Sequence, residues 1–182
     1  MKLLICGDTH GSLTSAEKLL DAFKSEKADY MIFLGDIMNH GPRNNIPENY
    51  NPSKVCDTFN SIKEKVIAVR GNCDSEVDEF LLQFPVSATY QTIILGKNKL
   101  FATHGHIFDN DKIPESILPG DIFAFGHIHI PILEKQDGII ILNPGSSALP
   151  KEPHPPTYAI LDDNKIAVKT FEGQNILEME LN

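Results

Sequence analysis

The sequence predicts an α/β protein in which two packed β-sheets are flanked by helices. Over residues 2–84, short apolar runs alternate with helical segments, a pattern typical of parallel strands joined by right-handed crossovers. From residue 89 onward, strands follow one another at short intervals and are separated by turn-forming residues. Two packed sheets with helices outside would bury both sets of strands.

In the first part of the chain, short runs rich in Ile, Val, Leu and Phe predict buried strands. They cover residues 3–7, 31–35 and 66–71. Between the first two runs, residues 13–27 place Leu19, Leu20 and Phe23 at helical spacing. Ser12 directly precedes this segment and can cap it, so a helix is expected there.

The second part of the chain contains seven expected strands, joined by turns rich in Gly, Asn and Asp. They cover residues 89–95, 99–103, 121–125, 132–135, 139–142, 158–161 and 165–171. By contrast, residues 38–53 show no periodicity and contain three prolines and five asparagines. Because loops of that length are uncommon and often functional, a binding loop or lid is expected here. The alternative is a tolerated surface insertion.

The 182 residues are expected to form a single domain covering 1–182, and an apolar content of 41% suffices for one core. No apolar run approaches the roughly 20 residues that span a bilayer, so we expect no membrane partner. The first apolar stretch is a strand, and the three cysteines lack the spacing of a disulfide framework, which favours a cytoplasmic location. The net charge of −9 disfavours binding to long nucleic acid.

Five of the apolar runs end on a small residue that is followed by a metal-binding side chain. Because function gathers at the carboxyl ends of strands in α/β sheets, these side chains are expected to meet in one crevice. Taken singly, most of them fit an ordinary turn residue or a hydrogen-bonded histidine, but five coincidences at equivalent positions favour a shared site. The predicted metal ligands are Asp8, His10, Asp36, Asn72, His104, His127 and His129.

This ligand set suits two divalent metal ions. Carboxylate, imidazole and amide oxygen donors accept Mn²⁺, Zn²⁺, Fe²⁺, Co²⁺ or Ni²⁺, and Mn²⁺ is our first choice. Two ions about 3.5–4 Å apart can hold a hydroxide in line with a phosphorus atom, because coordination lowers the pKa of water from near 15.7 to about 7. The set therefore predicts hydrolysis of a phosphate ester without a covalent protein intermediate.

These residues resemble the ordered motifs of the calcineurin-like metallophosphoesterases. The resemblance covers nearly the whole chain. The matching motifs are Asp8-x-His10, Gly35-Asp36, Gly71-Asn72, His104 and Gly126-His127-x-His129. The short length and the stretches at residues 39–44 and 68–76 are similar to those of a bacterial phosphodiesterase of the family. The resemblance implies a four-layer fold with two mixed β-sheets between helices. It also implies a phosphoric diester hydrolase that acts on a small phosphodiester.

The resemblance further implies how the ligands are shared between the two ions, with Asp36 bridging both. One ion would be held by Asp8, His10, Asp36 and His129. The other would be held by Asp36, Asn72, His104 and His127.

One position departs from the family pattern. The residue after Asn72 is usually a histidine that helps to protonate the leaving group, but here it is Cys73, either as a catalytic residue or as a small packed one. A thiol is a poor general acid near neutral pH, which implies good leaving groups or another acid. His40 is expected as that acid and Arg43 as a ligand of phosphate oxygens, unless both belong to a solvated loop. His106 is expected at the site entrance as a substrate-binding residue, or else as a hydrogen-bonded neighbour of the ligands.

Two other functions are compatible with the same residues. A phosphomonoesterase or nucleotidase could use the same site. A non-catalytic scaffold, similar to the retromer subunit of this family, could keep the fold, although a scaffold has no need for a complete ligand set. The turn Asn143-Pro144-Gly145-Ser146 is expected either to border the site or to be an ordinary tight turn. The oligomeric state stays open, with a homo-oligomer among the alternatives.

Overall fold

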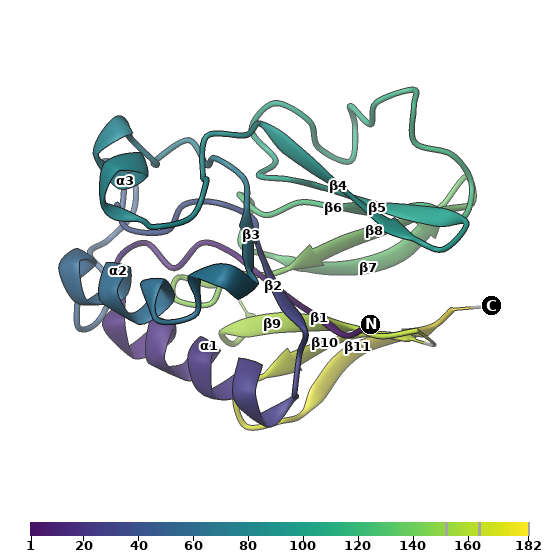
Figure 1. Cartoon of the computed structure of the whole chain (residues 1–182). Helices are drawn as coiled ribbons and strands as arrows, with labels where there is room; N and C mark the ends of the chain where they lie inside the picture. Colours follow the sequence, from purple (N-terminus) through teal and green to yellow (C-terminus); the bar gives the residue numbers. More distant parts are fainter. Residues whose placement is uncertain (152, 164, 182) are drawn as a thin grey trace.

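Two β-sheets pack face to face in the computed structural model, which describes residues 1–151, 153–163 and 165–181. The chain is an α/β protein with two mixed sheets, as the sequence predicts (Figure 1). Its helical elements are α1 (Leu13–Ser25), α2 (Pro52–Asn60), the short 3₁₀ helix η1 (Lys63–Lys65) and α3 (Glu76–Leu81). Its strands are β1 (Leu3–Cys6), β2 (Tyr30–Phe33), β3 (Val66–Ala68), β4 (Tyr90–Leu95), β5 (Asn98–Thr103), β6 (Ile122–Ala124), β7 (Pro131–Gln136), β8 (Ile139–Pro144), β9 (Thr157–Leu161), β10 (Lys165–Thr170) and β11 (Asn175–Glu180).

Each sheet contains three neighbouring parallel strands. In the six-stranded sheet, ordered β11-β10-β9-β1-β2-β3, the parallel strands are β1, β2 and β3, and the others pair antiparallel. In the five-stranded sheet, ordered β4-β5-β6-β8-β7, the parallel strands are β5, β6 and β8. The carboxyl ends of parallel strands lie at one edge of a sheet, so each sheet offers three such ends on which a site can be built.

The central strands β9, β1 and β2 of the six-stranded sheet are almost entirely buried, with neighbours on both faces, which explains why β1 and β2 are continuous apolar runs. In β1, Leu4 and Cys6 point toward the helices, whereas Leu3 and Ile5 point toward the other sheet. All four side chains are at most 1% exposed. Burial of an aliphatic side chain of this size contributes about 1.5–3 kcal/mol. The layer between the two sheets is therefore a continuous apolar core that holds them in a fixed relation.

Helix α1 begins where the sequence predicts and ends two residues earlier. The Ser12 side chain accepts the backbone N–H of Ser15, which caps the first turn. At the other end, Lys27 has a φ of 54°, and the N–H of Ala28 donates to the carbonyl of Phe23 at 3.2 Å. A residue with positive φ, followed by an N–H that donates back to the last turn, is a common way for a helix to end. Here it turns the chain toward β2.

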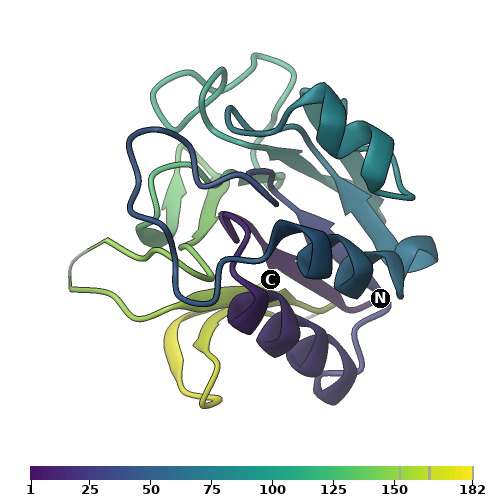
Figure 2. The same cartoon turned by 90° about the vertical axis from the view of Figure 1, so that its left-hand side faces the viewer.

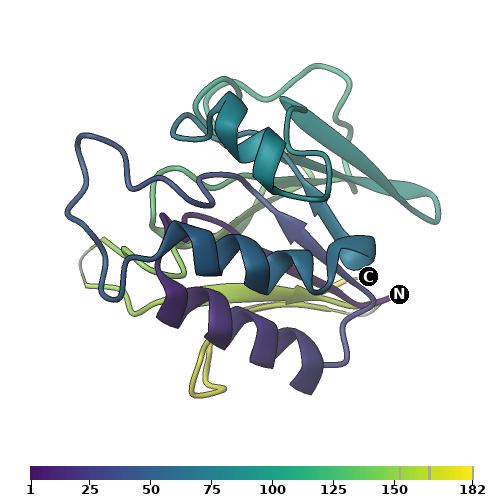
Figure 3. The same ribbon diagram turned by 60° about the vertical axis from the view of Figure 1, so that its left-hand side comes forward.

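The helical layer covers one sheet only. Figures 2 and 3 show α1 and α2 side by side against the six-stranded sheet. The outer face of the five-stranded sheet carries Phe101, Phe123 and Phe125, and the irregular segment 104–121 covers it with residues such as Ile117. This segment contains two prolines and two glycines, which disfavour a helix. The outer layer on this side is thus a packed loop rather than the expected helices.

Two further elements differ from the sequence analysis. Strand β11 was not predicted, because it is an edge strand in which exposed glutamates interrupt the apolar run. The predicted loop 38–53 is shorter, because Asn51 caps α2 and Pro52 occupies its first turn. Residues 38–51 contain no helix or strand apart from a single β-bridge between Tyr50 and Ser12.

None of the helices formed by the described residues combines the length and the apolar character that crossing a bilayer requires.

Candidate metal centre

The seven predicted ligands follow the carboxyl ends of the parallel strands. Asp8 and His10 come after β1, Asp36 after β2 and Asn72 after β3. From the five-stranded sheet, one histidine follows β5 and two follow β6, namely His104, His127 and His129. Contacts of at most 3.7 Å connect all seven side chains, so the two sheets bring together residues that are far apart in the sequence.

Five of these seven residues have a left-handed backbone. Their φ angles are 54° at Asp8, 49° at His10, 56° at Asp36, 67° at His127 and 62° at His129. Residues with a Cβ adopt this region rarely, at a cost of order 1–3 kcal/mol each. Such strain persists only where the surrounding structure enforces it, and it gathers at functional sites. The clustering therefore supports a functional role for this edge of the sheets.

Two glycines let the loops after β2 and β3 touch. A Cβ on Gly35 would lie 2.5 Å from the backbone nitrogen of Gly71. A Cβ on Gly71 would lie 2.0 Å from Oδ1 of Asp36. Because both distances are far below a normal contact, no larger residue fits without moving the loops. These contacts explain why glycine precedes both Asp36 and Asn72.

The inner half of the site is closed. Asp8 and His10 are fully buried, and His129 is 4% exposed. Nε2 of His129 lies 3.2 Å from Oδ1 of Asp8 and 3.2 Å from Nε2 of His10. Oδ2 of Asp36 lies 3.7 Å from Nε2 of His10 and 3.4 Å from Nε2 of His104. Asp36 therefore stands between two groups of potential ligand atoms.

The outer half of the site opens to solvent. Nε2 of His104 lies 3.0 Å from Oδ1 of Asn72 and 3.2 Å from Nδ1 of His127. His104 is fully buried, but Asn72 is exposed and His127 is half-buried. A ligand can approach from this half without any movement of the core.

Three histidines are oriented by backbone carbonyl groups. Their Nδ1 atoms contact the carbonyl oxygens of Asn39 (2.8 Å, from His10), Leu34 (2.7 Å, from His104) and Leu149 (2.6 Å, from His129). A carbonyl oxygen only accepts hydrogen bonds, so each Nδ1 carries a proton and each Nε2 faces the site. Ring nitrogens and carboxylate oxygens then converge at distances that fit a cation between them.

The electrostatics of the site also favour a cation. Burial alone would raise the pKa of Asp36, but the hydrogen bond and charge of His104 and the N–H of Cys73 hold it well below its usual range. Burial lowers the pKa of His104, yet Asp36 and Asp8 raise it to about 9. Two carboxylates thus stabilise positive charge here, on a proton or on a metal ion.

Asp8 provides an independent test of the fit to a metal. Its Oδ2 accepts the backbone N–H of His127 at 3.1 Å. Its buried Oδ1 lies 3.2 Å from Nε2 of His129, which carries no proton in the neutral ring whose Nδ1 donates to Leu149, so no described residue donates a hydrogen bond to it. A buried carboxylate oxygen without a donor is costly unless a cation binds it. The donor set and this oxygen together fit a divalent metal ion.

Asp74 ties the ends of β2 and β3 together, a role that the sequence analysis did not assign. Its carboxylate accepts the backbone N–H groups of Asp36 (2.8 Å), Ile37 (2.8 Å) and Gly71 (2.7 Å). Burial and the charge of Asp36 raise the pKa of Asp74 to about 6. In the sequence, the only indication of this role is that Asp74 lies two positions after Asn72. An aspartate in an ordinary turn could occupy the same position.

Replacement of Asp74 by Asn is expected to weaken metal binding by about 10–100-fold while the fold survives. The amide keeps one acceptor oxygen but cannot accept all three N–H groups, so the loop that carries Asp36 loses its alignment. Titration calorimetry of the metal-free protein measures the affinity. Asp57→Asn on the exposed face of α2 is the matched control. An unchanged affinity in Asp74→Asn would show that this carboxylate does not position the ligands.

The turn at residues 143–146 borders the site, in agreement with one of its two interpretations. The Ser146 hydroxyl donates to the carbonyl of Asp8 at 2.8 Å and accepts the N–H of Leu149 at 2.8 Å. The Asn143 amide donates to the carbonyl of Gly126 at 2.8 Å. The turn thus holds the backbone of Asp8 and of Gly126, which directly precedes His127.

Cys73 lies in the site and packs against the long loop. Its backbone N–H donates to Oδ1 of Asp36 at 2.8 Å, and its side chain lines a cavity of about 280 Å³ next to that carboxylate. A Cβ on Gly41 would lie 2.6 Å from its sulfur. Burial and Asp36 raise the pKa of Cys73 to about 12. The thiol is therefore a weaker acid than its type suggests.

The other predicted site residues take different positions. Arg43 lines the same cavity. His40 is not among the described residues that line it, and its ring packs edge-on against Tyr50 with centroids 5.3 Å apart. His106 is exposed, and its ring centroid lies 5.3 Å from that of His104. The structure thus brings Arg43 to the cavity, His106 to the open side of the histidine cluster, and His40 to neither.

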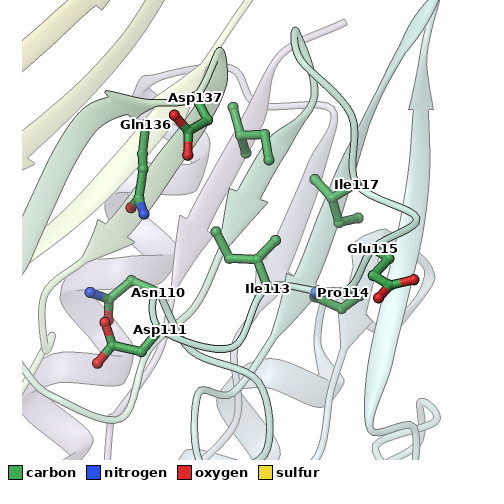
Figure 4. A pocket seen from close by; sticks show the side chains of 9 residues that line it. Asn110, Asp111, Ile113, Pro114, Glu115, Ile117, Gln136 and Asp137 are labelled. Atoms are coloured by element: carbon green, nitrogen blue, oxygen red, sulfur yellow. The ribbon is translucent and has the colours of Figure 1, made fainter.

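A separate cavity of about 280 Å³ contains none of the predicted site residues (Figure 4). It lies between the segment 110–117 and the turn that joins β7 to β8. Ile113 and Ile117 contribute apolar surface, and Asp111, Glu115 and Asp137 contribute acidic groups. No metal-ligand arrangement like that of the strand-end site occurs among its described residues.

Comparisons with known proteins place the chain among phosphoesterases. The family model of the calcineurin-like phosphoesterase superfamily domain matches residues 1–165. Phosphodiesterase YfcE of Escherichia coli strain K12 is 44% identical over 177 residues, which are 97% of this chain and 96% of that protein. The solved structure of the E. coli phosphoesterase Yfce superposes with a TM-score of 0.97 at 43% identity and covers 100% of both chains.

A more distant structure shares the fold alone. Wild-type Vps29 from Entamoeba histolytica, solved in complex with Zn²⁺, superposes with a TM-score of 0.68 at 22% identity and covers 100% of both chains. The two-sheet fold is therefore found with little sequence similarity, and only the residues of the site can carry a functional argument.

Proposed function

This chain belongs to the calcineurin-like phosphoesterase superfamily, and we propose that it is a metal-dependent phosphodiesterase that acts on small phosphodiesters. The observation that carries the proposal is the position of Asp36, whose Oδ2 lies 3.7 Å from Nε2 of His10 and 3.4 Å from Nε2 of His104. A carboxylate in this place can serve two metal ions at once. The 44% identity to a phosphodiesterase supports the same activity.

Two divalent ions would share the ligands as follows. Asp8, His10 and His129 would hold one, Asn72, His104 and His127 would hold the other, and Asp36 would serve both. Mn²⁺ is our first choice, and Zn²⁺, Fe²⁺, Co²⁺ and Ni²⁺ suit the same donors. Bound ions of this kind supply a hydroxide nucleophile near neutral pH and offset the charge of the phosphate.

The chain's own residues contribute orientation and charge. The carbonyls of Leu34, Asn39 and Leu149 hold the imidazoles in place, so the ligand nitrogens need no reorientation. The carboxylates of Asp8 and Asp36 bring a charge of −2, which two divalent cations exceed. The centre is then positive within an acidic protein, and it attracts a phosphodiester anion.

The expected substrates have good leaving groups. Of the two acids proposed from the sequence, Cys73 lines the cavity but has a raised pKa, whereas His40 packs against Tyr50. Neither is well suited to protonate a basic leaving oxygen. We therefore propose that the enzyme favours esters whose departing oxygen needs little protonation, and that solvent supplies the proton.

Parallel assays on a diester and a monoester test the proposal. Metal-free protein is loaded with one ion at a time and assayed on bis(p-nitrophenyl) phosphate and on p-nitrophenyl phosphate, which share a leaving group. We expect kcat/KM for the diester to exceed that for the monoester by at least about tenfold with Mn²⁺. A faster monoester would indicate a phosphomonoesterase or nucleotidase. No turnover of either ester with any ion would indicate a non-catalytic scaffold.

Replacement of Cys73 by His is expected to raise turnover most for poor leaving groups. An acid helps in proportion to the basicity of the departing oxygen, so the dependence of kcat on leaving-group pKa should become shallower. A series of aryl and alkyl phosphodiesters measures this slope in the wild type and the variant. Because Gly41 packs on the Cys73 sulfur, metal content and melting temperature are checked in parallel, with Cys73→Ser as the control. Equal slopes in all three proteins would show that residue 73 does not donate a proton to the leaving group.

A further inference from the structure

The cavity beside Asp36 does not end at the metal-ligand cluster. It has a volume of about 280 Å³ and adjoins a second cavity of about 240 Å³. The two have four lining residues in common, namely Arg43, Asn44, His129 and Lys151. A substrate bound at the metal centre can therefore extend its organic part into the outer cavity.

Each wall of this outer cavity is fixed to the metal-ligand cluster. On one side, the backbone N–H of Lys151 donates to the carbonyl of His129 at 3.1 Å, and Leu149 accepts from the ring of His129 at 2.6 Å. On the other side, the loop that carries Arg43 packs through Gly41 on the sulfur of Cys73. Figures 2 and 3 both show residues 38–51 and 145–151 extending from the same side of the molecule. These contacts fix the positions of both walls relative to the metal-ligand cluster.

The charge of these walls is opposite to that of the protein as a whole. The chain carries a net charge of −9, yet Asp36 is the sole acidic residue among the described residues that line either cavity. Arg43 and Lys151 contribute two cations, and neither pairs with a carboxylate within residues 1–151, 153–163 and 165–181. Asn44 and Asn45 add amide groups that can donate hydrogen bonds.

We propose that the outer cavity is a second anion-binding subsite, which selects phosphodiesters that carry a further phosphate group on their organic part. The inference rests on the proposed phosphodiesterase activity and deepens it. Both cations line the two cavities. We assign the second phosphate to Lys151, while Arg43 can contact either group. Charge-assisted hydrogen bonds from Arg and Lys are the usual means by which proteins bind phosphate. The scissile phosphorus stays at the metal-ligand cluster, and the additional phosphate takes no part in the reaction.

Two matched pairs of chromogenic esters test the preference. The first pair is thymidine 5′-(p-nitrophenyl phosphate) with and without a 3′-phosphate, and the second is the p-nitrophenyl phosphodiester of glycerol with and without a terminal phosphate. Within a pair the leaving group is the same. We expect the additional phosphate to raise kcat/KM by about tenfold or more in at least one pair, through KM. A preference in the first pair alone identifies a nucleotide, and a preference in both identifies recognition of the anion itself. Equal values in both pairs would overturn the proposal.

Variants of Lys151 identify the group responsible. Lys151→Met is expected to reduce the preference by about tenfold, and Lys151→Arg is expected to restore most of it. Lys97→Met, in the exposed turn between β4 and β5, is the control and should keep the preference. The readout is a ratio measured within one protein, so a general loss of activity cancels. A preference that survives in Lys151→Met would contradict the assignment.

Calorimetry separates this inference from the proposed function. Thymidine 3′,5′-bisphosphate should bind the metal-loaded protein at least about tenfold more tightly than thymidine 5′-monophosphate does, and Lys151→Met should remove the difference. If no ester is hydrolysed, the proposed activity fails, but the two affinities still decide whether the subsite exists. If the esters are hydrolysed and the two affinities are equal, the activity stands and the subsite is refuted.

Discussion

Replacement of Asp36 by Asn is expected to lower phosphodiesterase turnover by well over 100-fold. The substitution removes a negative charge from the point between His10 and His104. Without this charge, the two cations of the proposed centre would repel each other more strongly. Loss of a residue that only supports a ligand costs about 10–100-fold, so loss of a shared ligand should cost more. Metal content and kcat on bis(p-nitrophenyl) phosphate measure the effect.

The fold of the Asp36→Asn variant should survive. The side chain lies at the end of β2 and takes no part in the apolar layers that hold the two sheets together. Circular dichroism and the melting temperature of the metal-free protein check this, with Asp57→Asn as the surface control. A variant that kept both metal ions and more than about a tenth of the wild-type rate would show that Asp36 is not shared between them.

Removal of metal ions is expected to abolish turnover. No described serine or cysteine has the arrangement of an activated nucleophile, and the raised pKa of Cys73 keeps its thiol protonated. Protein treated with a chelator and dialysed should regain activity on addition of about two equivalents of Mn²⁺ per chain, followed by measurement of kcat. Full activity in the chelated protein would refute the metal-dependent mechanism.

The chelated protein should remain folded but melt at a lower temperature. Metal binding to the native state stabilises it by mass action, by about 2.7 kcal/mol when the free ion is at 100 times its dissociation constant. Because the apolar core lies between the sheets and under α1 and α2, the secondary structure is expected to persist without the ions. Circular dichroism with and without Mn²⁺ measures the shift, and the Asp36→Asn variant should show a smaller one.

The sequence alone predicted the strands that carry the site, because burial on both faces leaves a local signature. The runs at β1, β2, β3 and β6 are continuously apolar and end on small residues, so their ends could be located without the structure. Strand β11 lacked this signature because it is an exposed edge. The local sequence also could not predict that a loop covers the five-stranded sheet. That covering depends on which face of the sheet the segment 104–121 contacts in the tertiary structure.

The ligand types and the family were likewise evident in the sequence. Metal-binding side chains at five equivalent strand ends indicated a shared site, and the family model matches residues 1–165. The roles of these side chains as ligands stay predictions, as do those of Cys73, His40, Arg43 and His106. The structure adds that His40 lies against Tyr50 rather than in the cavity.

What the sequence determined by itself is the strands that carry the site and the chemical types at their ends, because each depends on neighbours within a few positions. The tertiary structure decided everything that depends on contacts between distant segments. The orientation of His129 is set by the carbonyl of Leu149, and the loop of Asp36 is held by Asp74, 38 positions away. Lys151 and Arg43 line the same cavity because the order of the strands brings their loops together. Such contacts leave no periodic signal, because the strand order, and not the local sequence, determines which loops meet.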